Sequence, residues 1–396
     1  MLANMTTLAD VCESVRYGYT ASAEADPVGP HFLRITDIVA DTIDWASVPY
    51  CAIEDSEKER FGIAPGDVVV ARTGATVGYA KMIRESMDAV FASYLVRFRV
   101  DPNKADPGFV GRLIESQAYK LFIRSRIGGA AQPNASAPVL GAFRFALPAR
   151  KIQKRIVSIL SAYDDLIENN RRRIQLLEQA ARLLYKEWFV RLRFPGHEHV
   201  KIKDGVPAGW ERIPLSEACE DIREQVNPSE VEPNTPYIGL EHIPRRSITL
   251  ADWGTAAEVG SGKFRFEVGD ILFGKIRPYF HKVGVALTSG ITSSDTIVIR
   301  PLQPALYEYS LLMVSSDEFV ALASKTVREG SKMPRADWKY LSAQRFLIPP
   351  RELLGTFAST VRAIIDQLKV LALQNRHLAC ARDILLPRLM NGEIAV

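Results

Sequence analysis

The feature that most constrains this chain is an internal duplication. The stretch FRFALPARKIQKRIVSIL at residues 143–160 is answered by QRFLIPPRELLGTFASTV at residues 344–361. At a separation of 201 positions, five residues of the first copy face identical residues of the second, namely Arg144 and Arg345, Phe145 and Phe346, Pro148 and Pro349, Arg150 and Arg351, and Asp165 and Asp366. Self-similarity at a fixed separation predicts two copies of one structural unit.

The duplication extends upstream of these helix entries. GDVVVARTGATVG at residues 66–78 corresponds to GDILFGKIRPYFHKVG at residues 269–284, and LADVCESV at 8–15 corresponds to LSEACEDI at 215–222. The separation changes between matched segments, which we interpret as insertions in the loops. The predicted order is therefore globular part, helix, globular part, helix.

Each predicted helix carries a heptad seam. The apolar and near-apolar positions of the first helix alternate in steps of four and three, at Tyr163, Ile167, Asn170, Ile174, Leu177, Ala181, Leu184 and Trp188. The matching positions of the second helix are Ile364, Leu368, Leu371, Asn375, Leu378, Arg382, Leu385 and Leu389. Helices of about 35 to 40 residues with matched seams predict an antiparallel pair with approximate twofold symmetry. Asn170 and Asn375 either set its register or lie at the solvent edge of the seam.

The globular parts predict an α+β fold. GDVVVAR, SYLVRFRV, GDILFGK and DTIVIRP have the composition of short strands bounded by Gly, Asp and Pro, and PGFVGRLIESQAYKLFIRSR and ALYEYSLLMVSSDEFVALASKTV predict helices after them. The stretch RFPGHEHVKIKDGVPAGW at residues 193–210 has the Pro, Gly and charge content of a linker.

Composition sets wide bounds on function. The 396 residues carry a formal net charge of +4, which permits a polyanionic partner without requiring one. Four scattered cysteines without CxxC or CxxH spacing predict neither disulfides nor a zinc site, and no apolar run is long enough for a membrane span. With no secretory pattern at the first residues, we expect a cytoplasmic protein.

Catalytic motifs are not visible in the sequence. VGSGKF at residues 259–264 lacks the first glycine and the hydroxyl residue of a phosphate-binding loop, and no GxGxxG follows a predicted strand. His197 and His199 lie in the linker with no third ligand nearby, and Cys12 and Cys219 have the apolar neighbours of core side chains. We therefore expect no catalytic centre, no metal and no cofactor bound by this chain.

The order of several short motifs resembles the specificity subunits of type I restriction-modification systems. They are GGAAQPN (128–134), FALPARKIQKRIVSIL (145–160), LLYKEWF (183–189), RFPGHE (193–198), VPAGWERIPL (206–215) and ILLPRLMNGEI (384–394). The resemblance implies two target recognition domains, at residues 1–147 and 208–347, each contacting one half of a bipartite, asymmetric DNA sequence. It also implies two spacer helices, at residues 148–193 and 348–396, with a linker at 194–207.

The same resemblance implies the partners. They are double-stranded DNA, two modification subunits that use S-adenosylmethionine to methylate adenine, and ATP-driven restriction subunits. The aromatic end of the first helix, with Tyr185, Trp188, Phe189 and Leu192, is wider than a two-helix seam and predicts a partner surface, packing on the globular part, or both.

Candidate DNA contacts lie in two kinds of loop. The first kind follows the matched strands and offers Arg72 and Thr73 in one copy and Lys275, Arg277, Tyr279 and His281 in the other. The second precedes the helices and offers Gln132 and Asn134 against Arg328, Lys332 and Arg335. Arginine pairs with guanine, amides pair with adenine, and cations neutralise phosphates. Because the two copies differ here, we expect two different half-sites.

Two other classes of function fit the same residues. A two-module DNA-binding regulator without a methyltransferase would share the loops, and a protein scaffold would share the helices. Binding to duplex DNA at two salt concentrations separates a scaffold from a DNA reader. Co-purification of a methyltransferase separates a regulator from a specificity subunit.

Overall fold

The computed structural model describes residues 4–39, 42–127, 133–325 and 334–396. The chain forms two compact units: unit 1 comprises Met1–Tyr163 and Arg382–Val396, and unit 2 comprises Asp164–Ala381. Both borders fall inside the long helices, whereas the sequence placed domain borders at the helix entries. This difference arises because each unit buries its own segment of both helices in its core.

Unit 1 is built on an antiparallel sheet of four strands, in the order β2 (Cys12–Tyr17), β7 (Leu95–Val100), β4 (Asp67–Ala71) and β5 (Ala80–Met82). Every residue of the central strand β4 is buried, as expected for a run of valines covered on both faces. A parallel pair joins β3 (His31–Leu33) to β6 (Ala89–Phe91), and an antiparallel pair joins β1 (Asn4–Thr7) to β8 (Arg144–Leu147). The helices are α1 (Ile35–Ile38), α2 (Asp55–Phe61), α3 (Pro107–Glu115), α4 (Gln117–Arg126) and α5 (Ala137–Gly141).

Unit 2 repeats this plan with additional strands. Its first sheet has the order β12 (Cys219–Asp221), β21 (Thr296–Pro301), β18 (Ile271–Gly274), β19 (Val283–Ala286) and β15 (Thr249–Leu250). A second sheet has the order β13 (Gln225–Val226), β17 (Lys263–Phe266), β20 (Gly290–Thr292), β14 (Pro236–Ile238) and β16 (Gly254–Thr255). Two strand pairs, β11 (Glu211–Pro214) with β22 (Arg345–Ile348) and β9 (Ile202–Lys203) with β10 (Val206–Pro207), and the helices α7 (Tyr307–Val314), α8 (Asp317–Ser324) and α9 (Trp338–Ala343) complete the unit.

The strands predicted from the sequence are confirmed as β4, β7, β18 and β21. Each predicted helical stretch after them divides into two helices, α3 and α4 in unit 1 and α7 and α8 in unit 2. The division has a local cause. Ser116 and Ser316 accept hydrogen bonds on their side-chain oxygens from the amides of Tyr119 (3.4 Å) and Phe319 (3.1 Å), and so begin a new helix.

The two long helices have the predicted lengths. Helix α6 (Arg150–Tyr185) has 36 residues and ends in one π-helical turn, Lys186–Val190, and α10 (Arg351–Met390) has 40 residues. At 1.5 Å per residue they are about 54 and 60 Å long. All sixteen residues of the two predicted seams are buried or half-buried, so the heptad pattern identified the inward faces of both helices.

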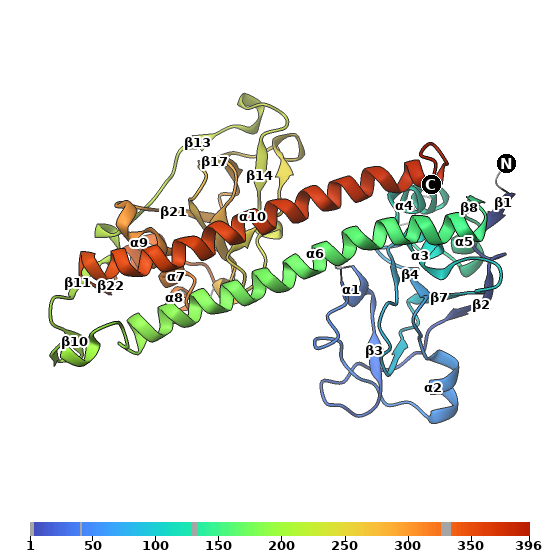
Figure 1. Cartoon of the computed structure of the whole chain (residues 1–396), viewed down its shortest axis with the longest axis horizontal. Coiled ribbons are helices and arrows are strands. Elements are labelled where there is room, and N and C mark those ends of the chain that lie inside the picture. The colour runs from blue at the N-terminus through green and yellow to red at the C-terminus, as the bar shows by residue number, and fades with distance from the viewer. Residues whose placement is uncertain (1–3, 40–41, 128–132, 326–333) are drawn as a thin grey trace. The chain divides into compact units, whose positions relative to one another are not determined.

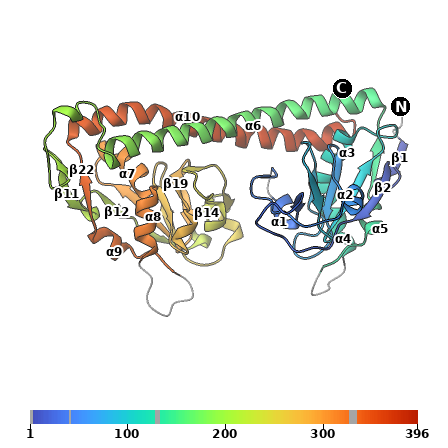
Figure 2. The same cartoon turned by 90° about the horizontal axis from the view of Figure 1, so that it is seen from below.

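Within unit 2 the two helices run antiparallel, as Figures 1 and 2 show. The rings of Phe189 and Phe357, at the end of the α6 helical run and the start of α10, lie 4.6 Å apart between centroids. Further along the pair, Nδ2 of Asn375 donates to the carbonyl of Ile167 at 3.3 Å. Asn170 is also buried. Neither asparagine therefore lies at a solvent edge, and Asn375 ties one helix to the backbone of the other.

The aromatic end of α6 packs on the globular part of unit 2. Phe189 is buried against the rings of Trp210, Tyr309 and Phe357, at centroid distances of 6.0, 5.0 and 4.6 Å. In unit 1, Ile156 and Leu160 of α6 share a core with residues of α3 and with Leu385 and Leu389 of α10.

Polar contacts fix the helices to the globular parts. In unit 2 the buried carboxylate of Glu178 on α6 accepts hydrogen bonds from Ser247 Oγ (2.8 Å), Ile248 N (3.0 Å) and Thr249 Oγ1 (2.7 Å). In unit 1 the guanidinium of Arg112 donates to Ser161 Oγ on α6 at 2.8 Å. Each globular part is thereby held to the helix pair of its own unit.

Candidate nucleic-acid interface

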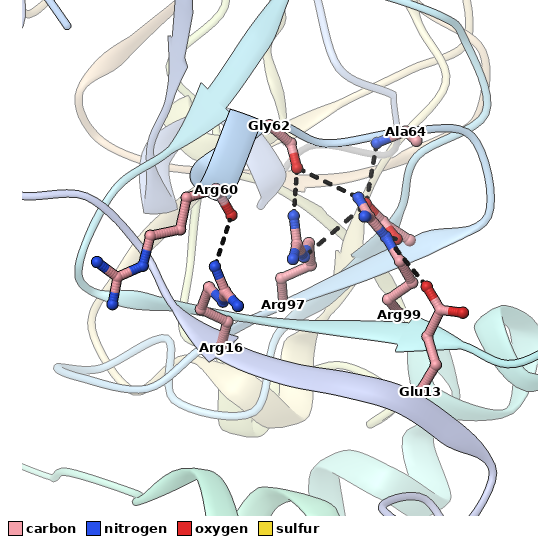
Figure 3. A network of polar contacts seen from close by, with 8 residues as sticks. Glu13, Arg16, Arg60, Gly62, Ala64, Arg97 and Arg99 are labelled. Atoms are coloured by element: carbon pink, nitrogen blue, oxygen red, sulfur yellow. Dashed lines mark hydrogen bonds and ion pairs between the residues drawn. The ribbon is translucent and has the colours of Figure 1, made fainter. Parts of the chain in front are cut away.

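An ion pair with a buried carboxylate supports the strand that leads to each candidate loop. In unit 1 the carboxylate of Asp67, 2% exposed at the start of β4, accepts from Arg99 Nε (2.8 Å) and Nη2 (2.7 Å) and from the amide of Ala64 (2.9 Å). Figure 3 shows the network around it, in which Arg97 and Arg99 both point to the carbonyl of Gly62. Burial lowers the pKa of Arg97 to about 10.

Unit 2 has the same ion pair. Asp270 precedes β18 and accepts from Arg300 Nε (2.7 Å) and Nη2 (2.8 Å) and from the amide of Glu267 (2.8 Å). The glycines before the two aspartates, Gly66 and Gly269, both have a positive φ, 93° and 94°. The Gly-Asp pairs of the duplicated sequence are therefore structural, because they fix where the central strand begins in both units.

The loops after the central strands follow the same backbone path. Loop 72–78 follows β4, loop 275–281 follows β18, and each has seven residues. Three main-chain hydrogen bonds recur in both loops. The amide of the first loop residue donates to the residue before a strand, as Arg72 N to Tyr94 O (2.9 Å) and Lys275 N to Asp295 O (2.7 Å), and its carbonyl accepts from Ala135 N and Ala336 N respectively (both 2.8 Å). The amide of the third loop residue donates to a proline carbonyl, as Gly74 N to Pro133 O (2.9 Å) and Arg277 N to Pro334 O (2.8 Å). One backbone frame is thus used twice.

This register corrects the sequence alignment of the loops. The shared Val-Gly at residues 77–78 and 283–284 suggested an insertion in the second copy. The structure closes both loops after the same number of residues, because Ala71 N donates to Tyr79 O and Gly274 N donates to Lys282 O, both at 2.8 Å. Position by position, Arg72 corresponds to Lys275, Gly74 to Arg277, Thr76 to Tyr279 and Gly78 to His281.

In unit 1 the described candidates gather at one place. Thr73 pairs with Asn134 in a single antiparallel bridge. Arg72 Nη2 lies 3.3 Å from Asn134 Oδ1, and its guanidinium lies over the ring of Tyr17 at 4.7 Å from the centroid. Asn134 is exposed and Arg72 is half-buried, so this site presents an amide and a positioned guanidinium together. Gln132 lies outside the described residues.

In unit 2 the corresponding residues are mostly charged. Ile276 pairs with Arg335 in the same kind of bridge, Arg335 Nη2 lies 3.4 Å from Asp295 Oδ1, and Lys275 Nζ donates to the carbonyl of Ser294 at 3.3 Å. Lys275, Arg335 and Asp295 of unit 2 thus occupy the positions of Arg72, Asn134 and Tyr94 in unit 1. Arg328 and Lys332 lie outside the described residues.

The middle of loop 275–281 presents aromatic and cationic groups. Tyr279 is 53% exposed, and its ring centroid lies 4.9 Å from that of Phe280. The guanidinium groups of Arg245 and Arg277 lie over the Phe280 ring at 4.1 and 5.8 Å from its centroid. The sequence did not single out Arg245, because it comes from a different segment of the chain and carries no motif of its own.

His281 is a correction to the candidate set. It is 5% exposed, its Nε2 lies 2.8 Å from the carbonyl of Ser315, and its Nδ1 lies 3.4 Å from the carboxylate of Asp317. Burial lowers the pKa of this imidazole. A buried ring held by Ser315 at the end of α7 cannot reach a base edge, so His281 anchors the loop.

Asp295 and Tyr94 support the candidate loops although the sequence did not point to them. They precede β21 and β7 at matching positions, and their carbonyls hold the first residue of each loop. Pattern alone gave little signal, because each lies one residue before a strand and belongs to no motif.

Other groups in the described residues offer little chemistry. Burial raises the pKa of the Cys12 thiol to about 12 and that of Cys219 to about 11, which disfavours a nucleophilic thiolate. Within the described ranges, no cluster of three or more His, Cys, Asp and Glu residues could hold a metal ion. The helices of the same part of the chain are too short or too polar to cross a membrane.

Comparison with known proteins points to one family. Residues 3–179 match the model of the type I restriction modification DNA specificity domain. The specificity subunit of the type I restriction enzyme MjaIX from Methanocaldococcus jannaschii is 23% identical over 72% of this chain and 68% of that protein. The specificity subunit of the type I restriction enzyme HindI from Haemophilus influenzae is 21% identical over 84% of this chain and 87% of that protein.

A solved structure has the same fold. The S subunit of a type I restriction-modification system from M. genitalium superposes with a TM-score of 0.56 over 98% of this chain and 96% of that one, at 17% identity. The chain is thus an α+β protein with two similar units and two long helices. In sequence it is similar to specificity subunits of type I restriction enzymes, and its fold is that of a solved S subunit.

Proposed function

We propose that this chain reads a bipartite, asymmetric DNA sequence for a type I restriction-modification complex and carries no catalytic centre of its own. The observation that carries the proposal is the repeated loop frame. The backbone hydrogen bonds that hold Arg72 in unit 1 hold Lys275 in unit 2, but the side chains mounted on the frame differ. One frame with two sets of side chains is suited to reading two different half-sites.

The side chains of the two frames have chemistry that suits base edges. In unit 1, Asn134 and Arg72 supply an amide and a guanidinium, which pair with adenine and guanine in the major groove. In unit 2, Lys275, Arg277 and Arg335 supply cations for guanine or phosphate, and the carboxylate of Asp295 can accept from cytosine. The second half-site is therefore expected to depend more on charge than the first.

The similarity to type I specificity subunits supports a set of partners, which form part of the proposal. Two modification subunits would bring S-adenosylmethionine and methylate adenine, and restriction subunits would bring ATP-driven translocation. The paired helices would serve as the spacer and as the docking region. Half-sites one duplex turn apart are about 34 Å from centre to centre, a distance shorter than either helix.

Mapping of methylated adenines tests the proposal most completely. The genome of the host is compared with and without this gene, with the modification subunits present in both cases. The proposal expects one bipartite motif, with two unlike halves and a fixed gap, to lose methylation when the gene is absent. An unchanged methylation map contradicts it.

A binding experiment separates the proposal from the two rival classes. The chain is purified from its host together with any subunits bound to it, and the preparation is mixed with duplex DNA at 50 and 200 mM salt. A DNA reader loses affinity steeply with salt, by about 10³-fold or more if six phosphates are contacted. A protein scaffold shows no shift of the duplex, and a simple regulator binds DNA but co-purifies with no methyltransferase.

A further inference from the structure

We propose that Tyr279 is a wedge that inserts between stacked base pairs of the half-site read by unit 2, with Arg245 beside it on the DNA backbone. This inference rests on the proposed function and deepens it. It assigns unit 2 a mode of recognition, local unstacking of the duplex, that unit 1 does not share. The argument begins with the conformation of the loop.

Loop 275–281 keeps a backbone shape that normally requires glycine. In loop 72–78 the third and seventh residues are Gly74 and Gly78, with φ of 77° and 86°. In loop 275–281 the same positions are Arg277 and His281, with φ of 49° and 53°. Residues with a Cβ are strained in this region, and such strain persists only where the surroundings enforce it. Unit 2 thus has residues with side chains, Arg277 and His281, at two positions where unit 1 adopts the same backbone conformation with glycine.

Neighbouring segments enforce the strained shape. The amide of Arg277 donates to the carbonyl of Pro334 (2.8 Å), the imidazole of His281 bonds to the carbonyl of Ser315 (2.8 Å), and the amide of Arg246 donates to the carbonyl of His281 (2.9 Å). Pro278, next to Tyr279, is buried. An arch fixed at both ends loses little conformational entropy when its tip enters a ligand, so it is suited to a mechanical task.

The tip of the arch presents Tyr279 with cations close by. Its ring is 53% exposed and rests edge to face on Phe280, whose own ring carries Arg245 and Arg277. The corresponding residue of unit 1 is Thr76, which is too small to fill the space between base pairs. The aromatic tip is therefore specific to unit 2.

DNA-bending proteins insert apolar side chains between base pairs and compensate for the lost stacking with additional backbone contacts. An aromatic ring on a rigid arch can replace part of the lost stacking, and the flanking guanidinium of Arg245 can hold a phosphate of the opened step. Pyrimidine–purine steps open most easily. We therefore expect such a step at a fixed place in the second half-site.

The test uses the complex of this chain with its modification subunits and a duplex of the methylated motif found by mapping. 2-Aminopurine is placed at each position of the second half-site in turn, because its fluorescence rises when it is unstacked. The wild-type complex and Tyr279→Phe are expected to give a several-fold rise at one step. Tyr279→Ala is expected to abolish the rise and to weaken binding by about ten- to a hundred-fold.

A matched control removes an exposed apolar side chain elsewhere in unit 2. Val268 is 59% exposed and precedes β18, at the opposite end of that strand from the loop. Val268→Ala is expected to leave the fluorescence rise intact. The wedge is overturned if the wild-type complex binds the motif without a rise anywhere in this half-site, or if Tyr279→Ala keeps the rise. A wild-type complex that does not bind the motif refutes the proposed function as well.

Discussion

Replacing Arg277 by glycine separates the work of its side chain from that of the loop. The change gives loop 275–281 the residue that loop 72–78 has at the same backbone position, where Gly74 has a φ of 77°. It removes the guanidinium that lies 5.8 Å from the Phe280 ring centroid, while the hydrogen bond of the residue 277 amide with Pro334 can remain. The fold is expected to tolerate it.

The expected effects on stability and on DNA discrimination differ in size. Relief of the left-handed strain stabilises the folded chain by about 1 kcal/mol. Two effects oppose this gain: the greater freedom of glycine in the unfolded chain, about 0.5–1 kcal/mol, and the loss of an exposed cation–π contact, about 0.5–1 kcal/mol. The net change in the free energy of unfolding is therefore within about 1 kcal/mol of zero. Loss of a bidentate base contact costs about 1–3 kcal/mol of discrimination, which is about 5- to 150-fold.

The assay pairs thermal unfolding with competitive DNA binding. Competitor duplexes carry base substitutions in one half of the methylated motif at a time. Arg277→Gly is expected to bind all competitors altered in the second half-site more equally, and to keep its discrimination in the first. Gly74→Arg is the reciprocal change, and a Cβ there meets no heavy atom within 4 Å.

Two results would refute this reasoning. If Arg277→Gly unfolds with a loss of several kcal/mol, the side chain supports the fold and the strain argument is wrong. If the variant is stable and still discriminates fully in the second half-site, Arg277 does not read it.

Three further predictions concern the supports of unit 2. Glu178→Ala leaves three donors of unit 2 unpaired and is expected to lower the free energy of unfolding by about 3–5 kcal/mol. The control Glu168→Ala removes an exposed ion pair on the same helix and should lower it by less than about 1 kcal/mol. Equal losses in chemical denaturation would contradict the role of Glu178. Asn375→Leu replaces a half-buried amide whose Oδ1 has no hydrogen-bond partner, and is expected to leave the melting temperature unchanged or to raise it. A decrease of more than about 2 kcal/mol in the free energy of unfolding would show that the amide is required. Burial lowers the pKa of His281, so as the pH falls the unfolded chain takes up a proton before the folded chain does. Stability is therefore expected to fall as the pH drops below about 6.5, by at most about 1.4 kcal/mol per pH unit. In unfolding curves between pH 7.5 and 5.5, His281→Gly should lose less stability than the wild type, and an equal dependence of stability on pH would contradict this role of His281.

Periodic and repeated features were predictable from the sequence. The heptad positions from Tyr163 to Trp188 lie on the inward face of α6, because an apolar stripe at helical spacing must be buried. The strands were found in the same way, since GDVVVAR and GDILFGK are apolar runs bounded by turn residues. These features depend on local composition, which the sequence contains directly.

The loop register and the backbone strain were not predictable. The shared Val-Gly of the two copies suggested an insertion, but the hydrogen bonds that hold the third residue of each loop involve Pro133 and Pro334, about 60 residues further along the chain. The sequence KIRPYFH does not indicate that Arg277 and His281 have a positive φ, or that the His281 side chain points inward to Ser315. Long-range pairing decides these features, and pattern reasoning does not reach it.

The central claim is that two units with one loop frame read two half-sites independently. It is tested most directly by exchanging residues 208–347 for the corresponding module of another specificity subunit and mapping methylated adenines in the host. The account predicts that one half of the motif changes, while the other half and the gap between them stay the same. A change in both halves would contradict it.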